Sequence, residues 1–417
     1  MRPFRFAVLL LLAATTTARA DVFRLLDDDQ QAAQARVDLF QQATSEIDAL
    51  YFLARNDRIT LAALALLRDA HRRGVANVRL IVDANFEHIP KSVLAYLRDE
   101  GVQIKVYHPL TLRHPLWVFY RMHEKVIIAD RARYITGGRN LAEDYFGLSK
   151  RNFVDRDVYV EGASATEAQR HFENLWGSRH VADLALRVTP ADKANAERLL
   201  DGALEDLQRG GFVRLDTNTD WSAGQKEVAT EFLHDPPLPH DGPRVGVRLT
   251  EVLEKARQSI VLESPYFVPS RALLRLLDKK RAEGVRVMIV TNSMSSTDGL
   301  LPYVAYLKYR RHLVRSGVDV REFKGPDCLH AKSAVIDGHL ALVGSYNIDR
   351  RSENLNTEVM SVADDEAVAG ELLAAIDAHA ARTWRIGVRR ERVRRSRVVA
   401  LRMWAVRMLL PFVEGQL

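Results

Sequence analysis

One short pattern occurs twice in this chain of 417 residues, and it limits the folds that the chain can adopt. Both copies read H-x-K-x4-D-x6-G-[GS]-x-N, the first beginning at His123 and the second at His330. The surrounding segments repeat too: residues 47–53 resemble 260–268, residues 74–83 resemble 284–291, and residues 101–107 resemble 317–323. Self-similarity on this scale indicates two copies of one structural unit.

Each unit predicts an α/β fold. β-Branched runs of strand length alternate with helical stretches, such as residues 60–71 and 271–283. That alternation favours βαβ units, so we expect two α/β halves of like topology, each a mainly parallel sheet flanked by helices. A Pro-rich stretch at 236–243 is typical of a linker. The predicted domains are 1–20, 21–205, 206–380 and 381–417.

The first twenty residues are typical of a secretory signal. Arg2 and Arg5 precede an apolar run at 7–14, and Ala18-Arg19-Ala20 is an A-x-A cleavage pattern. The run is too short to span a bilayer, although an ordinary strand or an uncleaved anchor is an alternative. We therefore expect export to the periplasmic side, peripheral association with the membrane and a mature chain from Asp21. The single cysteine, Cys328, excludes an intramolecular disulfide.

The motif spacing gathers its polar side chains at one edge of each sheet. His and Lys at i and i+2 of a strand share a face. The Asp-Arg and Asp-Gly pairs that follow are typical of hairpin turns, which bring the Gly- and Asn-containing end back beside His and Lys. The two sets are His123, Lys125, Asp130, Gly138 and Asn140, and His330, Lys332, Asp337, Ser345 and Asn347.

Two such sets suit one kind of chemistry. Paired histidines can act as nucleophile and general acid, while paired lysines and asparagines hold a phosphoryl group and its developing charge. No carboxylate cluster for a divalent metal accompanies them, so we expect no metal and no cofactor. The pattern predicts two-step displacement at a phosphodiester through a phosphohistidine.

The duplicated motif resembles the signature of the phospholipase D superfamily. Further segments resemble its bacterial cardiolipin synthase branch, and those in the first half and at the end resemble the class C members most. The segments are 265–269, 291–293, 296–298, 347–352 with Asn356 and Glu358, 121–123, 137–140, 145–146, 155–157 and 410–414. The match covers residues 23–417, nearly the whole mature chain.

The resemblance implies a shared active site between the packed halves. By family analogy His123 is the nucleophile and His330 the acid, an order that sequence symmetry leaves open. Lys125 and Lys332 would bind phosphate oxygens, with Gly138, Asn140, Ser345 and Asn347 also at the substrate. Asp130 and Asp337 would either orient the histidines or hold the hairpins. Glu358 matches a carboxylate of the family, and the first half has no obvious equivalent of it.

Two segments bear on the substrate. Residues 108–121 are rich in Leu and aromatic residues and abut His123, so they are either an apolar loop meeting lipid or a core-packing insertion. Residues 381–407 contain ten Arg and one Glu, a net charge of +9, before a largely apolar end. The 381–412 tail is either a helix on an anionic membrane or one packed on the body.

Charge separates the candidate functions. The chain's net charge is +6, to which Arg2, Arg5 and Arg19 contribute +3 and the tail +9, so the catalytic body is acidic. This favours phospholipid over nucleic acid as the partner, because a nuclease needs a basic groove. We expect a cardiolipin-synthase-like phosphatidyltransferase. A phospholipase D or other phosphodiesterase is the alternative, and an exported nuclease is a lesser one.

Overall fold

The computed structural model describes residues 19–184, 186–187, 189–239, 244–387, 403–408 and 410. The expected signal segment lies outside the described residues apart from Arg19 and Ala20, which open strand β1. Most of the basic tail and the last four residues of the Pro-rich stretch also lie outside them. No helix in the described ranges is both long and apolar enough to cross a bilayer.

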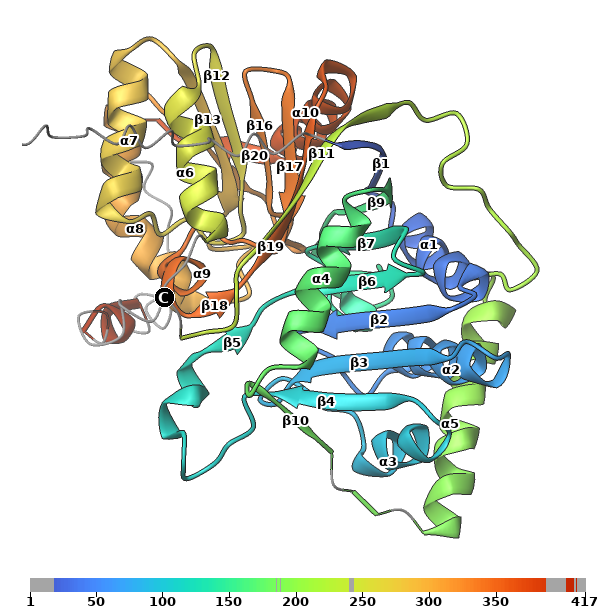
Figure 1. Cartoon of the computed structure of the whole chain (residues 1–417). Helices are drawn as coiled ribbons and strands as arrows, with labels where there is room; N and C mark the ends of the chain where they lie inside the picture. Colours follow the sequence, from blue (N-terminus) through green and yellow to red (C-terminus); the bar gives the residue numbers. More distant parts are fainter. Residues whose placement is uncertain are drawn as a thin grey trace, which may run out of the picture.

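The first half runs from β1 to residue 226 (Figure 1). Its strands are β1 (Arg19–Leu26), β2 (Glu46–Tyr51), β3 (Asn77–Asp83), β4 (Gln103–Tyr107), β5 (Arg121–Met122), β6 (Lys125–Ala129), β7 (Arg133–Gly137), β8 (Phe153–Val154), β9 (Asp157–Gly162) and β10 (Val181–Asp183). Its helices are α1 (Asp29–Gln42), α2 (Arg58–Arg72), α3 (Lys91–Asp99), α4 (Ala165–Trp176) and α5 (Pro190–Arg209), with short 3-10 turns η1 (Pro115–Phe119) and η2 (Glu143–Tyr145).

The second half repeats this order. Its strands are β11 (Glu227–His234), β12 (Ser259–Glu263), β13 (Arg286–Asn292), β14 (Asp319–Phe323), β15 (Cys328–Leu329), β16 (Ser333–Ile336), β17 (Leu340–Gly344), β18 (Asn356–Thr357), β19 (Val359–Asp364) and β20 (Thr383–Arg385). Its helices are α6 (Val245–Lys255), α7 (Arg271–Ala282), α8 (Leu300–Arg315), α9 (Arg350–Asn354) and α10 (Glu366–Ala381).

Sixteen strands form one continuous sheet with a twofold-repeated order. It reads β10-β4-β3-β2-β6-β7-β9-β1, then β11-β19-β17-β16-β12-β13-β14-β20. The predicted α/β class is confirmed, and the three repeated segment pairs form β2 and β12, β3 and β13, and β4 and β14. Parallel pairing is confined to β2–β3–β4 and β12–β13–β14, and the other pairs in this sheet are antiparallel. Each half-sheet is therefore mixed, with the parallel strands as its βαβ part.

The two halves share a core. Helices α1, α2, α3 and α5 cover one face of the first half-sheet, and α6, α7 and α8 cover one face of the second (Figure 1). A third apolar cluster draws on both half-sheets and on α4 and α10. The parallel strands are buried on both faces, which explains their nearly continuous apolar sequence.

The boundary between the halves differs from the predicted 205/206. Helix α5 packs on α2 and α3, and Val213 and Trp221 belong to the apolar core of the first half. The second half therefore begins at β11, which pairs antiparallel with β1 at the centre of the sheet. The Pro-rich stretch follows β11 and so lies inside the second half. Its described part, residues 236–239, is therefore not a linker between the halves.

Arg156 ties the halves together from a fully buried position. Its Nη1 donates to Glu263 Oε2 at 2.6 Å and to Ser333 Oγ at 2.9 Å, both in the second half. Glu263 also accepts from His379 Nδ1 at 2.7 Å. Removing one partner of a buried pair is costly because it leaves an uncompensated charge.

We therefore expect Arg156→Met to lower the free energy of unfolding by about 3 kcal/mol. The measurement is urea denaturation followed by circular dichroism. The control is Arg170→Met, because Arg170 is exposed and pairs with Glu167 of its own helix, three residues away. A loss no larger than that of the control would mean that Arg156 does not hold the halves together.

Candidate active site

The two motif hairpins form as predicted. Strands β6 and β7 pair through a turn at Asp130-Arg131, and β16 and β17 through one at Asp337-Gly338. All four turn residues have positive φ, between 53° and 75°, as a tight hairpin of this kind requires. The hairpins bring each Gly-rich end back beside its own His-x-Lys segment.

Two short pairs of parallel strands fix the positions of the histidines. Strand β5, just before His123, pairs with β18, just before Glu358. Strand β15, just before His330, pairs with β8, just before Asp155. Because each strand pair joins one half to the other, each histidine lies against a carboxylate of the opposite half.

The resulting His–carboxylate contacts are short and buried. His123 Nδ1 lies 2.9 Å from Glu358 Oε2, and His330 Nδ1 lies 2.6 Å from Asp155 Oδ2. Both carboxylates are at most 2 % exposed. A bond at Nδ1 fixes the tautomer of each ring and leaves Nε2 for chemistry. Asp155 is thus the first-half equivalent of Glu358 that sequence reasoning missed.

Glu358 and Asp155 are held by different neighbours. Ser345 Oγ donates to Glu358 Oε2 at 2.5 Å, and Ser352 Oγ donates to its Oε1 at 2.6 Å. At the position matching Ser345, a Cβ on Gly138 would lie 1.9 Å from Asp155 Oδ1. The two residues expected at the substrate therefore position the carboxylates: Ser345 by donating, and Gly138 by leaving space.

The lysines lie at the same buried centre. Lys125 Nζ donates to His123 O at 2.5 Å, and Lys332 Nζ lies 2.7 Å from His330 Nδ1 and 3.1 Å from its Nε2. Burial and the charge of Lys332 lower the pKa of Lys125 to about 7. Burial also lowers the pKa of Lys332. Two ammonium groups that repel each other in a dry site form a receptor for an anion.

The histidines differ in their electrostatics. Burial, together with Lys125 and Lys332, holds the pKa of His123 well below its ordinary value. Burial and Lys332 also lower the pKa of His330, but Asp155 acts against them. Burial opposes ionisation of Asp155, yet Lys332 and His330 outweigh it and lower its pKa. Glu358 has the opposite balance, because burial raises its pKa to about 7.

The asparagines are buried near the histidines but differ in role. Asn140 Oδ1 accepts from Leu53 N at 3.2 Å, so this amide braces the loop after β2. Asn347 Oδ1 has no hydrogen-bond partner among the residues that the structure describes. Asn347 N donates to Ser352 Oγ at 3.2 Å, which links it to the Glu358 site.

Asp130 and Asp337 do not touch the histidines. Asp337 accepts from the backbone N–H groups of 257, 258 and 259, and Asp130 from those of 44, 45 and 46. Burial opposes ionisation of both, but these N–H donors lower both pKa values. Two roles were considered for these aspartates. The structure shows that they hold the hairpins, and it shows no contact between them and the histidines.

Positioning extends to the residue before each histidine. Asp83 Oδ2 accepts from Met122 N at 3.0 Å, and Asn292 Oδ1 accepts from Leu329 N at 3.0 Å. Asp83 ends β3 and Asn292 ends β13, so the side chain at the matching strand end accepts the same backbone hydrogen bond in each half. Asp83 is the last residue of the repeated segment 74–83, and Asn292 directly follows its partner segment 284–291, a signal that the motif alone did not reveal.

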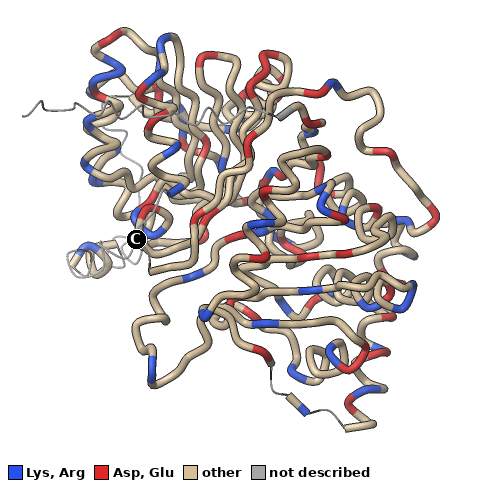
Figure 2. Tube along the Cα trace, viewed as in Figure 1, with Lys and Arg blue, Asp and Glu red and all other residues tan. Residues whose placement is uncertain are grey.

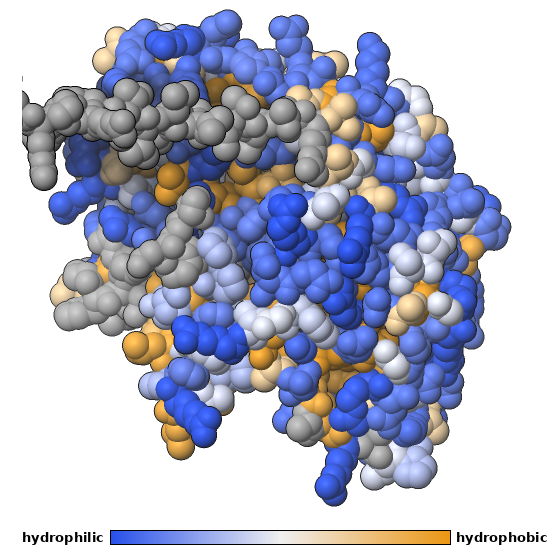
Figure 3. Space-filling view, viewed as in Figure 1, coloured by the Kyte–Doolittle hydropathy of each residue, from blue (hydrophilic) through white to orange (hydrophobic). Residues whose placement is uncertain are grey.

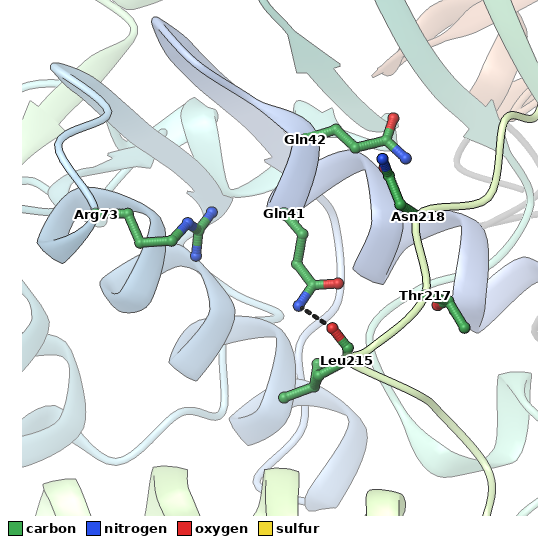
Figure 4. A pocket seen from close by; sticks show the side chains of 6 residues that line it. All are labelled: Gln41, Gln42, Arg73, Leu215, Thr217 and Asn218. Carbon is green, nitrogen blue, oxygen red and sulfur yellow. Dashed lines mark hydrogen bonds between the residues drawn. The ribbon is translucent and has the colours of Figure 1, made fainter.

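Acidic residues elsewhere do not suggest a metal centre. In the described part of the chain, one group of three potential ligands comes together, Glu46, Asp48 and Glu173. The guanidinium of Arg79 bonds Asp48 at 2.6 Å and Glu173 at 2.7 Å and so supplies the countercharge. A surface hollow of about 470 Å³ also lies apart from the histidines, beside the end of α1 (Figure 4). Its lining includes Gln41, Arg73 and Asn218, with no histidine or carboxylate.

The continuous two-half sheet and the paired His, Lys and Asn sets define a protein of the phospholipase D superfamily. More particularly, the chain belongs to the family described as cardiolipin synthase, PLD-like domain, whose profile matches residues 37–176 and 249–384.

Named relatives are similar over most of their length. Cardiolipin synthase C of Escherichia coli (strain K12) is 27% identical over 386 residues, covering 82% of this chain and 81% of the relative. Minor cardiolipin synthase ClsB of Bacillus subtilis (strain 168) is 25% identical, covering 81% and 76%. The crystal structure of phosphatidylserine synthase from Haemophilus influenzae Rd KW20 superposes with a TM-score of 0.71 at 16% identity, covering 96% of this chain and 97% of that one. That likeness shows the shared fold.

The two kinds of aspartate are separable by mutation. We expect Asp337→Ala to lower the free energy of unfolding by about 2 kcal/mol, because three backbone N–H groups lose their acceptor, while turnover below the melting temperature stays within about threefold. Asp155→Asn should lower turnover roughly 100-fold or more even below its own melting temperature, because His330 loses the charge of its partner. Calorimetry and a phosphodiesterase assay measure the two. Similar losses of turnover in both variants would contradict this division.

Proposed function

We propose that the protein is a cardiolipin-synthase-like phosphatidyltransferase acting through a covalent phosphohistidine. The crossed pairing of each histidine with a carboxylate of the other half is the observation that carries this proposal. It supplies two oriented imidazoles beside two buried ammonium groups, which suits in-line displacement at a phosphodiester. The names of the relatives indicate a phospholipid as substrate.

The electrostatic difference supports an order of events. His123, whose pKa is lowered most clearly, is neutral and offers a free Nε2 lone pair to phosphorus. His330 faces the ionised Asp155, which stabilises the imidazolium that gives a proton to the leaving alcohol. The P–O bond to that alcohol breaks as the His123 N–P bond forms. A second lipid's hydroxyl then attacks phosphorus, His330 takes its proton, and His123 is released.

The order can be tested with leaving groups of different basicity. A p-nitrophenyl phosphodiester needs no acid, so His330→Ala should form the phosphoenzyme from it at a rate near wild type but lose activity on phosphatidylglycerol. His123→Ala should form no phosphoenzyme from either substrate. Acid-labile label on the protein is the readout. Labelling of His123→Ala but not of His330→Ala would reverse the assignment.

Labelled phosphatidylglycerol then separates transfer from hydrolysis. With wild-type enzyme and a chelator present, cardiolipin supports the transferase, whereas phosphatidic acid alone would make the protein a hydrolase. Strict dependence on a divalent metal would contradict the mechanism.

Anion binding should depend on pH through Lys125. Its pKa is about 7 in the free enzyme, so the ammonium is present below this pH and is lost as the pH rises. Sulfate keeps its charge from about pH 6 to about pH 9, so its affinity should fall about tenfold per unit above about pH 7, with proton uptake on binding. Calorimetry in buffers of different ionisation enthalpy measures both. Lys125→Met should make the dependence shallower and leave the part that comes from Glu358, whose pKa burial also raises to about 7. A flat profile in the wild type would refute the prediction.

We also propose that the tail binds an anionic membrane after export of the protein. Met403 and Leu410 are buried against the core of the second half, whereas Trp404 and Met408 are 61% and 59% exposed. The end of the tail therefore docks on the body and still presents apolar side chains. Lys/Arg and Asp/Glu are interspersed over both halves (Figure 2), so the Arg-rich tail is the concentrated source of positive charge.

A further inference from the structure

The segment between β4 and β5 exposes a run of large apolar side chains. Leu110, Leu112 and Leu116 are 69%, 102% and 63% exposed, and Phe119 is 39% exposed. The segment projects from the left edge of the molecule in Figure 1, and hydrophobic surface gathers on that projection in Figure 3. An insertion that served core packing would bury these side chains, so the structure contradicts that alternative.

The projection is anchored at its base. Trp117 stacks between His108, at 4.4 Å between ring centroids, and His114, at 4.1 Å. His108 is itself buried and bonds His180 Nδ1 at 2.9 Å and Tyr120 O at 3.0 Å. The backbone at His108 has φ of 48°, an unusual value for a non-glycine residue, which these contacts hold in place. These contacts fix the base of the segment, so the leucines are held in exposed positions.

The segment is also joined directly to the catalytic centre. It ends at β5, whose next residue is His123. Arg121 Nη1 bonds Asp83 Oδ1 at 2.8 Å, and Asp83 holds Met122 next to the nucleophile. From the other half, Arg351 Nη2 reaches Phe119 O at 3.5 Å. Because the segment leads directly into His123, a surface that the leucines enter lies close to the histidines.

We propose that the segment 108–121, the apolar projection, inserts into the lipid bilayer and draws substrate headgroups to the histidines, an inference that rests on the proposed lipid chemistry. The exposed part of the projection carries Arg113 and no carboxylate, which complements an anionic lipid surface. Full exposure of Leu112 at the tip suits a fluid apolar phase better than a shaped protein pocket. Trp404 and Met408 provide a second exposed apolar contact on the tail.

The test is binding of the full chain to vesicles of phosphatidylcholine and phosphatidylglycerol at about 0.1 M and about 0.5 M salt. Salt screens the attraction of the Arg-rich tail, so the apolar projection should carry the binding that remains at high salt. The triple variant Leu110→Ser, Leu112→Ser, Leu116→Ser should bind about 100-fold more weakly there, because three side chains lose their transfer from water. Val247→Ser, at a 54% exposed position on α6, is the matched control.

Turnover supplies the second readout. The triple variant should lose activity on vesicles at high salt and keep it, within about twofold, on a short-chain phosphatidylglycerol below its micelle concentration. Unchanged vesicle binding by the variant would overturn the inference. So would loss of a lipid-free dimer in the variant, which would make a second copy of the chain the occupant. A wild-type enzyme inactive on every phospholipid would overturn the proposed function, while the binding difference would still test the projection.

Discussion

The active site depends on pairing between the halves. Each histidine sits at the end of a two-residue strand that is hydrogen-bonded to a strand of the opposite half, and His123 N and His330 N donate to the carbonyls of Thr357 and Val154 at 3.0 Å and 2.8 Å. Since Glu358 and Asp155 come next on those partner strands, the backbone register dictates both contacts. Each half supplies the carboxylate that contacts the other half's histidine, so both His–carboxylate contacts need both halves.

This arrangement makes a nearly symmetric fold electrostatically unequal. The two carboxylates are similarly buried, but at Asp155 the charges of Lys332 and His330 outweigh burial, whereas at Glu358 burial outweighs the charge of Lys125 and two hydroxyl donors. The pKa values are therefore driven in opposite directions, and the two histidines experience different fields. Gly138 leaves space for Asp155, whereas Ser345 at the matching position donates to Glu358, so one small substitution gives the two carboxylates different neighbours. Two copies of one motif can thus take two chemical roles.

Much of this was predictable from sequence because the repeat fixes local structure. The repeated strands and the hairpin turns follow from short-range spacing and form where expected, whereas His123 and His330 lie between strands and not within them. Asp155 was not predicted, because its partner His330 is 175 residues away and lies in the other half. The predicted 205/206 boundary falls inside α5, because this helix and the residues up to Trp221 reveal their half only by packing. The roles of Asp130 and Asp337 could not be predicted either, because their backbone partners lie about 80 residues away in the sequence.

The surroundings of the histidines bear on the fate of the intermediate. Phe52 lies 4.7 Å from His123 between ring centroids, with Phe86 against it at 4.2 Å, and Phe153 lies 4.9 Å from His330. In the proposed mechanism these aromatic walls reduce the space for water beside phosphorus, which helps an alcohol delivered from a lipid surface to compete with it. In the proposed mechanism the buried lysines attract one phosphodiester at close range, while the net acidic charge of the body disfavours a polyanion. Both features favour an acceptor that arrives by way of a membrane.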